Sequence, residues 1–254
     1  MSETQSGISE AESPPEPEPR RRIQIPQLVP YVTYTFMGVS ILFFLVQLGT
    51  QSFLNLDLPA AYGVKSNRLI RMGQYWRLLT PLLLHGSLLH LGFNMYALYI
   101  LGRRLERYFG HGRFLALYIL GGFCGNIFSF LLTEANSLGS STAIFGLLGA
   151  EGVFLYQNRD LLGDRFRQAI SQIIQVAAIN LLIGLSPGID NWGHIGGLIG
   201  GVAFTWFAGP VFRVEGISPF LELKDQRSSS TITLVFVLLA FILSFVVWWV
   251  IQSG

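Results

Sequence analysis

The sequence predicts an all-α polytopic membrane protein, and three observations support this fold class. Of the 254 residues, 51% are hydrophobic and 13% are charged, whereas a soluble domain usually carries about 25% charged residues. The apolar residues form long blocks, and a helix needs about 20 residues to cross the apolar core of a bilayer. Most Lys and Arg residues lie between these blocks, where they indicate topology.

Residues 1–29 are expected to form a disordered cytoplasmic tail, because their Pro and Glu content prevents a packed core. Three consecutive arginines, 20–22, precede the first apolar block and favour a cytoplasmic N-terminus. No early apolar stretch indicates a cleavable signal peptide. The net charge of +2 gives no reason to expect a nucleic-acid partner, and the single cysteine, Cys124, allows no disulfide within the chain.

Seven spans are expected, at 31–49, 88–107, 114–132, 141–157, 168–185, 193–212 and 231–251. With seven spans, the three Arg-rich connections fall on the side of the N-terminus, as the distribution of positive charge requires. The long first loop, 50–87, breaks this rule with four Lys and Arg residues, so we expect it to fold onto the membrane surface. The fifth span is the least apolar, because Gln168, Gln172 and Gln175 share one helical face.

Two polar residues from different spans lie at matched depth. Ser141 precedes Arg159 by 18 residues, and His194 precedes Arg213 by 19 residues. At about 1.5 Å per residue, both lie roughly 27–28 Å from these basic residues. On span two, His90 and Asn94 are one turn apart and share a face. Polar side chains inside a membrane are costly and indicate function.

Glycine-rich faces would bring these residues together. Span six contains Gly197 and Gly201 in "GHIGGLIGG", and span four begins with Gly139 in "GSSTAIFG" and continues with further glycines. Small residues allow two helices to approach closely in lipid, so Ser141 would reach His194. Singly, each feature has an ordinary explanation: a helix cap, an interfacial histidine, or a packing contact. Their combination at one depth favours a catalytic site.

Other catalytic motifs do not fit. "GSSTA" lacks the second glycine of the G-x-S-x-G elbow, and no H-E-x-x-H metal motif is present. No pair of acidic residues in the spans indicates a membrane aspartyl dyad. Glu151 is expected to contact a polar or Arg side chain. On a helix, consecutive side chains diverge by about 100°. Only one of Ser140, Ser141 and Thr142 can therefore face His194, and we expect Ser140 to be a cap and Thr142 to face lipid or a neighbouring helix.

These motifs together resemble the rhomboid family of intramembrane serine proteases. "HGSLLHLGFN" resembles the family's span-two motif, "GSSTAIFG" its G-x-S-x motif and "GHIGGLIGG" its H-x-x-G-x-x-x-G motif. "YWRLLTPLLLH" resembles the Trp-Arg motif of the first loop, and "GRRLERYFG" the stretch that closes span two. The resemblance implies a six-helix protease core over residues 30–215. Residues 216–254 would form a linker and a seventh transmembrane helix.

The resemblance implies peptide-bond hydrolysis with Ser141 as nucleophile and His194 as base. The oxyanion would be bound by the Ser141 backbone N–H and by the His90 and Asn94 side chains. Thr142 departs from the glycine that commonly follows the nucleophile in the family. The supporting residues would be Phe145, packed on His194, together with Trp76, Arg77, Gly139, Gly197 and Gly201. No metal or cofactor is expected.

The expected partners are the lipid bilayer and transmembrane protein substrates, with the fifth span as a gate for their entry. The oligomeric state stays open. Two other classes remain: an inactive rhomboid-like protein that binds membrane clients, and a channel or carrier, for which the expected inverted repeats are not found. The expected location is a bacterial plasma membrane with a cytoplasmic N-terminus, and an organelle membrane is the alternative.

Overall fold

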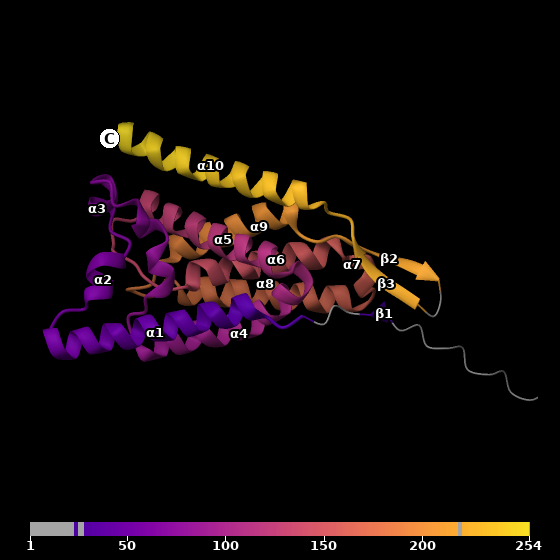
Figure 1. Ribbon diagram of the computed structural model, residues 1–254, viewed down its shortest axis with the longest axis horizontal. Helices are drawn as coiled ribbons and strands as arrows, with labels where there is room; N and C mark the ends of the chain where they lie inside the picture. The colour runs from indigo at the N-terminus through magenta and orange to yellow at the C-terminus, as the bar shows by residue number, and fades with distance from the viewer. Residues whose placement is uncertain (1–22, 25–27, 218–219, 254) are drawn as a thin grey trace, which may run out of the picture.

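The computed structural model describes residues 23–24, 28–217 and 220–253, and it is a bundle of helices that run along one common axis (Figure 1). Four of the described helices, α1, α5, α8 and α10, are long and apolar enough to cross a membrane. The protein is thus a mostly helical, multi-pass membrane protein. The seven long helices are α1 (Tyr31–Leu54), α4 (Leu88–Phe109), α5 (His111–Leu132), α6 (Ser141–Gln157), α8 (Arg165–Ile183), α9 (Asn191–Ala208) and α10 (Ser229–Ser253).

Helix α6 lies at the centre of the bundle, against α4, α5, α8 and α9. Eleven of its residues are buried, whereas α8 has no buried residue and α10 buries only Val247. Helix α10 runs along one side over α5 and α9, and α1 lies with α4 on the opposite side (Figure 1). The core is apolar and includes Leu98, Phe114, Leu117, Tyr118, Leu147, Ala150 and Phe204.

Glycines let α6 and α9 meet backbone to backbone. A Cβ on Gly197 would overlap the carbonyl oxygen of Thr142, and a Cβ on Gly201 would overlap that of Gly146. Because no larger residue fits at these two positions, the two helices approach more closely than side-chain-bearing residues would allow. The helix starts of α6 and α9 are thereby held side by side.

The start of α1 is completed by a residue from another helix. Its N-cap, Pro30, makes no side-chain cap hydrogen bond. Instead, the buried Glu106 carboxylate of α4 accepts from the backbone N–H groups of Val32 at 2.9 Å and Thr33 at 2.8 Å. It also accepts from the Thr33 hydroxyl at 2.6 Å. A negative charge at this position stabilises the exposed N–H groups of a helix start.

One end of the bundle, which we call the loop end, carries the connection between α1 and α4 (Figure 1). This connection contains α2 (Leu58–Gly63), α3 (Asn67–Arg71) and the 3₁₀ helices η1 (Tyr75–Leu78) and η2 (Thr80–Leu83). Lys65 is fully buried here, and its ammonium donates to the carbonyl oxygens of Thr133 at 2.8 Å and Ala135 at 2.9 Å. Burial lowers the pKa of Lys65 to about 8. The first loop is therefore a folded unit attached to the end of α5.

The opposite end, the hairpin end, carries a small sheet that the sequence analysis did not predict (Figure 1). Strands β2 (Phe212–Ile217) and β3 (Phe220–Asp225) pair in antiparallel fashion, and β1 (Ile23–Gln24) pairs with β3 in parallel. Strand β2 crosses the predicted boundary between the protease core and the linker, at residues 215 and 216. Within the predicted tail 1–29, Ile23 and Gln24 form β1, while residues 1–22 and 25–27 lie outside the described part.

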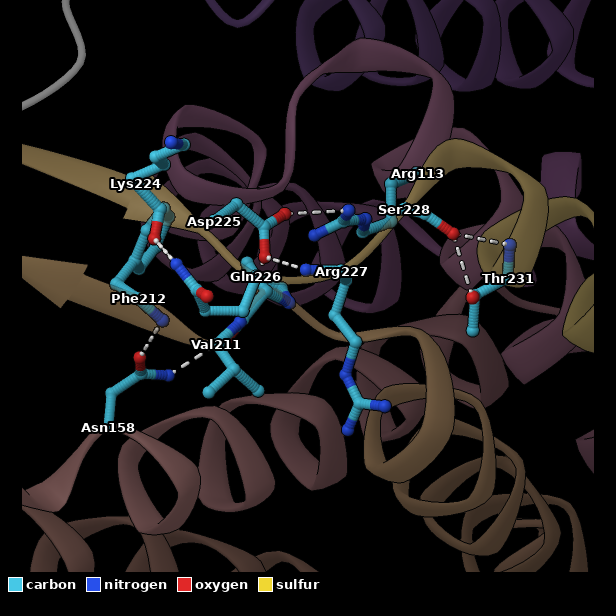
Figure 2. A network of polar contacts seen from close by, with 11 residues as sticks. Arg113, Asn158, Val211, Phe212, Lys224, Asp225, Gln226, Arg227, Ser228 and Thr231 are labelled. Atoms are coloured by element: carbon cyan, nitrogen blue, oxygen red, sulfur yellow. Dashed lines mark hydrogen bonds and ion pairs between the residues drawn. The ribbon is translucent and has the colours of Figure 1, made fainter.

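Two side chains attach the hairpin to the bundle, as Figure 2 shows. Asn158, at the end of α6, accepts from the Phe212 N–H at 2.7 Å and donates to the Pro210 carbonyl at 3.0 Å. Asp225 pairs with Arg113 of α5 at 2.8 Å and also accepts from the backbone N–H groups of Val211 and Arg227. The connection between α9 and α10 is therefore fixed to α5 and α6. A short helix, α7 (Arg159–Leu162), follows Asn158 directly.

Candidate active site

The structure brings Ser141 and His194 into hydrogen-bond distance, with 3.0 Å between the Ser141 Oγ and the His194 Nε2. Ser141 is the first residue of α6, and His194 lies in the first turn of α9. Both helices begin at the loop end, and their contact through Gly197 and Gly201 sets the separation of the two side chains. His194 is buried and Ser141 is partly buried.

Phe145 lies one turn after Ser141 and stacks on His194. Their ring centroids are 4.2 Å apart and their planes differ by 9°. Within the described part of the chain, the His194 Nδ1 has no hydrogen-bond partner. The carboxylate nearest in sequence, Asp190, caps α9 by accepting from the Gly193 N–H at 2.9 Å. Stacking on Phe145, rather than a carboxylate, thus orients the imidazole.

His90 and Gly139 lie next to Ser141. Gly139 has a φ of 131°, which side-chain-bearing residues rarely adopt. A Cβ there would lie 2.7 Å from the His90 Nε2 and 3.6 Å from the Ser141 Oγ. The glycine therefore makes space for the His90 ring beside the Ser141 hydroxyl. Asn94 is buried, and its amide donates to the His90 carbonyl at 2.9 Å.

His85 belongs to the same cluster, although the sequence analysis did not select it. Its Nε2 lies 3.3 Å from the Ser140 Oγ, and its ring contacts His90 edge-on, with centroids 5.2 Å apart. Burial and the nearby His90 lower the pKa of His85 to about 4, so this imidazole is neutral at physiological pH. Ser140 occupies the predicted N-cap position of α6, but its side chain makes no cap hydrogen bond.

The side chain of Thr142 faces neighbouring helices and not lipid. It is 5% exposed. A Cβ on Gly125 of α5 would lie 2.6 Å from the Thr142 Cβ, and a Cβ on Gly193 of α9 would lie 3.0 Å from its methyl group. Two glycines therefore accommodate the β-branched residue that follows Ser141 in this chain.

Trp76 and Arg77 act inside the first loop. The Trp76 indole donates to the Tyr62 carbonyl at 3.0 Å, and Arg77, which is buried, donates to the carbonyls of Val64 at 2.9 Å and Ala61 at 2.8 Å. Arg77 therefore binds backbone carbonyls within the first loop. The same loop reaches the site, because the Pro81 carbonyl accepts from the Gly139 N–H at 2.9 Å.

No group of three or more His, Cys, Asp or Glu side chains within residues 23–24, 28–217 and 220–253 is arranged to hold a metal ion.

Comparison with known families finds that the rhomboid domain matches residues 72–211. The chain belongs to the rhomboid family. The match begins in the first loop of this rhomboid and ends just after α9, so it contains every candidate site residue named above.

Relatives of this rhomboid come from bacteria and plants. Rhomboid protease GluP of Bacillus subtilis (strain 168) is 44% identical over 174 residues, which are 68% of this chain and 34% of GluP. RHOMBOID-like protein 9, chloroplastic, of Arabidopsis thaliana is 34% identical over 160 residues, which are 63% of this chain and 37% of that protein. RHOMBOID-like protein 7 of the same plant is 38% identical over 182 residues, covering 66% of this chain and 58% of the relative. The similarity thus spans about a third to somewhat more than half of these proteins.

Proposed function

We propose that this rhomboid is an intramembrane serine endopeptidase in which Ser141 is the nucleophile and His194 is the base. The observation that supports this most directly is the distance of 3.0 Å between the Ser141 Oγ and the His194 Nε2. A hydroxyl and an imidazole in this arrangement are the two groups that an acyl-enzyme mechanism needs. The name of GluP, a rhomboid protease, supports the same reaction.

In this mechanism His194 takes the Ser141 proton while the Ser141 oxygen attacks the scissile carbonyl carbon. The resulting oxyanion accepts from the Ser141 backbone N–H and from His90, whose ring lies beside Gly139. Asn94 joins them once its amide turns away from the His90 carbonyl. His194 then gives the proton to the leaving amine, and the C–N bond breaks. Water attacks the acyl-enzyme with His194 again as base, which releases the acid and restores Ser141.

The proposed substrates are transmembrane segments of other membrane proteins, cut near the loop end. The hairpin end would be cytoplasmic, because α4 ends there with three arginines and α7 and α8 add Arg159, Arg165 and Arg167. The N-terminus would lie on the same side, since β1 pairs with β3. A bacterial plasma membrane is the proposed location. The chloroplastic plant relative makes an organelle membrane the alternative to test.

Cleavage of a single-span substrate by the purified protein in liposomes tests the proposal. We expect cleavage by the wild-type protein and none by Ser141→Ala or His194→Ala. Ser186→Ala is a matched control, because Ser186 lies between α8 and α9 and makes no side-chain hydrogen bond to the site. Stable binding of the substrate without cleavage by the wild-type protein would instead favour the rhomboid-like client-binding function.

A further inference from the structure

Helices α4 and α6 are joined by an ion pair far from Ser141. The Arg104 guanidinium of α4 pairs with the Glu151 carboxylate of α6. The Glu151 side chain is 3% exposed, and its second oxygen has no partner within the described residues. Arg104 therefore neutralises a carboxylate that the bundle buries completely. Burying an unpaired charge is far more costly than burying a paired one.

Arg104 lies on the same face of α4 as the two proposed oxyanion donors. Positions 90, 94, 97, 101, 104 and 108 follow alternating steps of four and three, which define one stripe of a helix. The stripe also faces α6 on the hairpin-end side of the ion pair, because the Tyr108 ring packs on Phe154 of α6 with centroids 5.2 Å apart. His90, Asn94 and Arg104 are thus fixed relative to one another by a single rigid helix.

The pair lies at equal distances from both halves of the candidate site. Arg104 follows Asn94 by ten residues, and Glu151 follows Ser141 by ten residues. At 1.5 Å per residue, each charge lies about 15 Å along its helix from the corresponding site residue. Both helices run from the loop end toward the hairpin end. The ion pair therefore holds the two helices at the axial alignment that places Asn94 level with Ser141.

We propose that Arg104 and Glu151 are positioning residues that fix the register of α4 on α6 and thereby place His90 and Asn94 at the oxyanion. This proposal rests on the proposed protease function. Apolar side chains discriminate poorly between neighbouring registers in lipid, whereas a buried carboxylate with one charged partner, here the half-exposed Arg104, has one favourable alignment. A slip of one residue moves a side chain by about 1.5 Å, and misplacement by about 1 Å can cost roughly a hundredfold in rate.

Steady-state kinetics of the Arg104→Gln variant provide the first test. We expect kcat to fall by roughly tenfold to a hundredfold with KM nearly unchanged, because substrate binding does not use this part of α4. Arg103→Gln is the matched control: its guanidinium lies 4.4 Å from the Tyr99 ring centroid on its own helix, so kcat should be unchanged. The exchanged pair, Arg104→Glu with Glu151→Arg, should recover kcat. If the exchanged pair does not fold, the neutral pair Arg104→Gln with Glu151→Gln should fold and keep the low kcat.

A double-mutant cycle separates positioning from general stability. In an Asn94→Ala background, Arg104→Gln should cause little further loss, because the group that it positions is already missing. Losses that multiply, or a wild-type kcat in Arg104→Gln, would overturn the proposal. Absence of Ser141-dependent cleavage by the wild-type protein would overturn the protease function instead. In that event thermal unfolding still tests the pair: Arg104→Glu should lower the unfolding temperature, and unchanged stability would refute the contact.

Discussion

Ser140, Ser141 and Thr142 are three consecutive hydroxyl residues that meet three different surroundings. Ser140 contacts His85, Ser141 contacts His194, and Thr142 packs against glycines of α5 and α9. The sequence alone predicts that one of the three faces His194, because helical neighbours diverge by about 100°. It does not predict His85 as the partner of Ser140. His85 lies in an irregular part of the first loop, 55 positions before Ser140, where no helical spacing relates the two residues.

Labelling with a serine-directed fluorophosphonate should distinguish these hydroxyls. We expect labelling of the wild-type protein to be lost in Ser141→Ala and in His194→Ala, because only this hydroxyl has a base at 3.0 Å. Thr142→Ala should still be labelled. Mass spectrometry of the labelled peptide identifies the modified residue. A label on Ser140 would contradict the assignment of the nucleophile.

The proposed oxyanion donors can be tested by their effect on turnover. Removing one such donor typically lowers kcat by about 10²–10³-fold, and we expect this of His90→Ala and Asn94→Ala. KM should change little, because the donors bind charge that develops only in the transition state. Kinetics with one substrate at several concentrations separate the two constants. Intact turnover in both variants would reduce His90 and Asn94 to packing residues.

At the scale of elements, the long helices follow from the sequence and the sheet does not. The predicted spans at 114–132, 141–157 and 231–251 agree with α5, α6 and α10 to within about three residues, because apolar blocks define them. The hairpin is not predicted, because the short, charged segments Phe212–Ile217 and Phe220–Asp225 fit a polar connection between two spans as well as they fit exposed strands. Helices α4, α6 and α9 carry the candidate site and fall outside the set that is apolar and long enough to span. Helix α6 has only 17 residues, and polar residues and glycines lower the hydropathy of α4 and α9.

Helix α8 is expected to move when substrates enter. It has no buried residue, and Gln172 and Gln175 are exposed on it. Replacing both with Leu makes this face favourable in lipid and should slow cleavage of transmembrane substrates without lowering the unfolding temperature. Gln51→Leu, on α1, is a control with a similar exposed position. Equal rates on several substrates would argue against a gate.

The first loop should depend more strongly on Arg77 than on Trp76. Arg77→Ala removes buried hydrogen bonds to the Ala61 and Val64 carbonyls, each worth about 1.5–3 kcal/mol for a charged donor. Trp76→Ala removes one bond from a half-exposed side chain. Thermal unfolding in detergent should show a larger decrease for Arg77→Ala, with activity falling in parallel. Lost activity at full stability would indicate direct contact with substrate.

At the scale of the whole molecule, the loop end and the hairpin end of the bundle have different roles. The loop end holds the candidate site, and the hairpin end joins α5, α6, α9 and α10 through Asn158 and Asp225 (Figure 2). We expect Asn158→Ala to destabilise the protein by about 1–3 kcal/mol, because it leaves the partly buried Phe212 N–H and the buried Pro210 carbonyl without partners. Activity per folded molecule should be unchanged. Ser230→Ala, on the exposed start of α10, is the control. Equal unfolding temperatures for Asn158→Ala and the wild-type protein would contradict a stabilising role for Asn158.

The contact between Glu106 and the start of α1 has a consequence for how the chain is made. The ribosome releases α1 before α4, yet the opening turn of α1 takes its cap from a carboxylate 73 residues further along. Until that residue has been translated and inserted, the N–H groups of Val32 and Thr33 lack their partner. Helix α1 therefore reaches its final form only after α4 has arrived. Nascent chains stalled before Glu106 should leave the first turn of α1 open to amide hydrogen exchange, and longer chains should protect it.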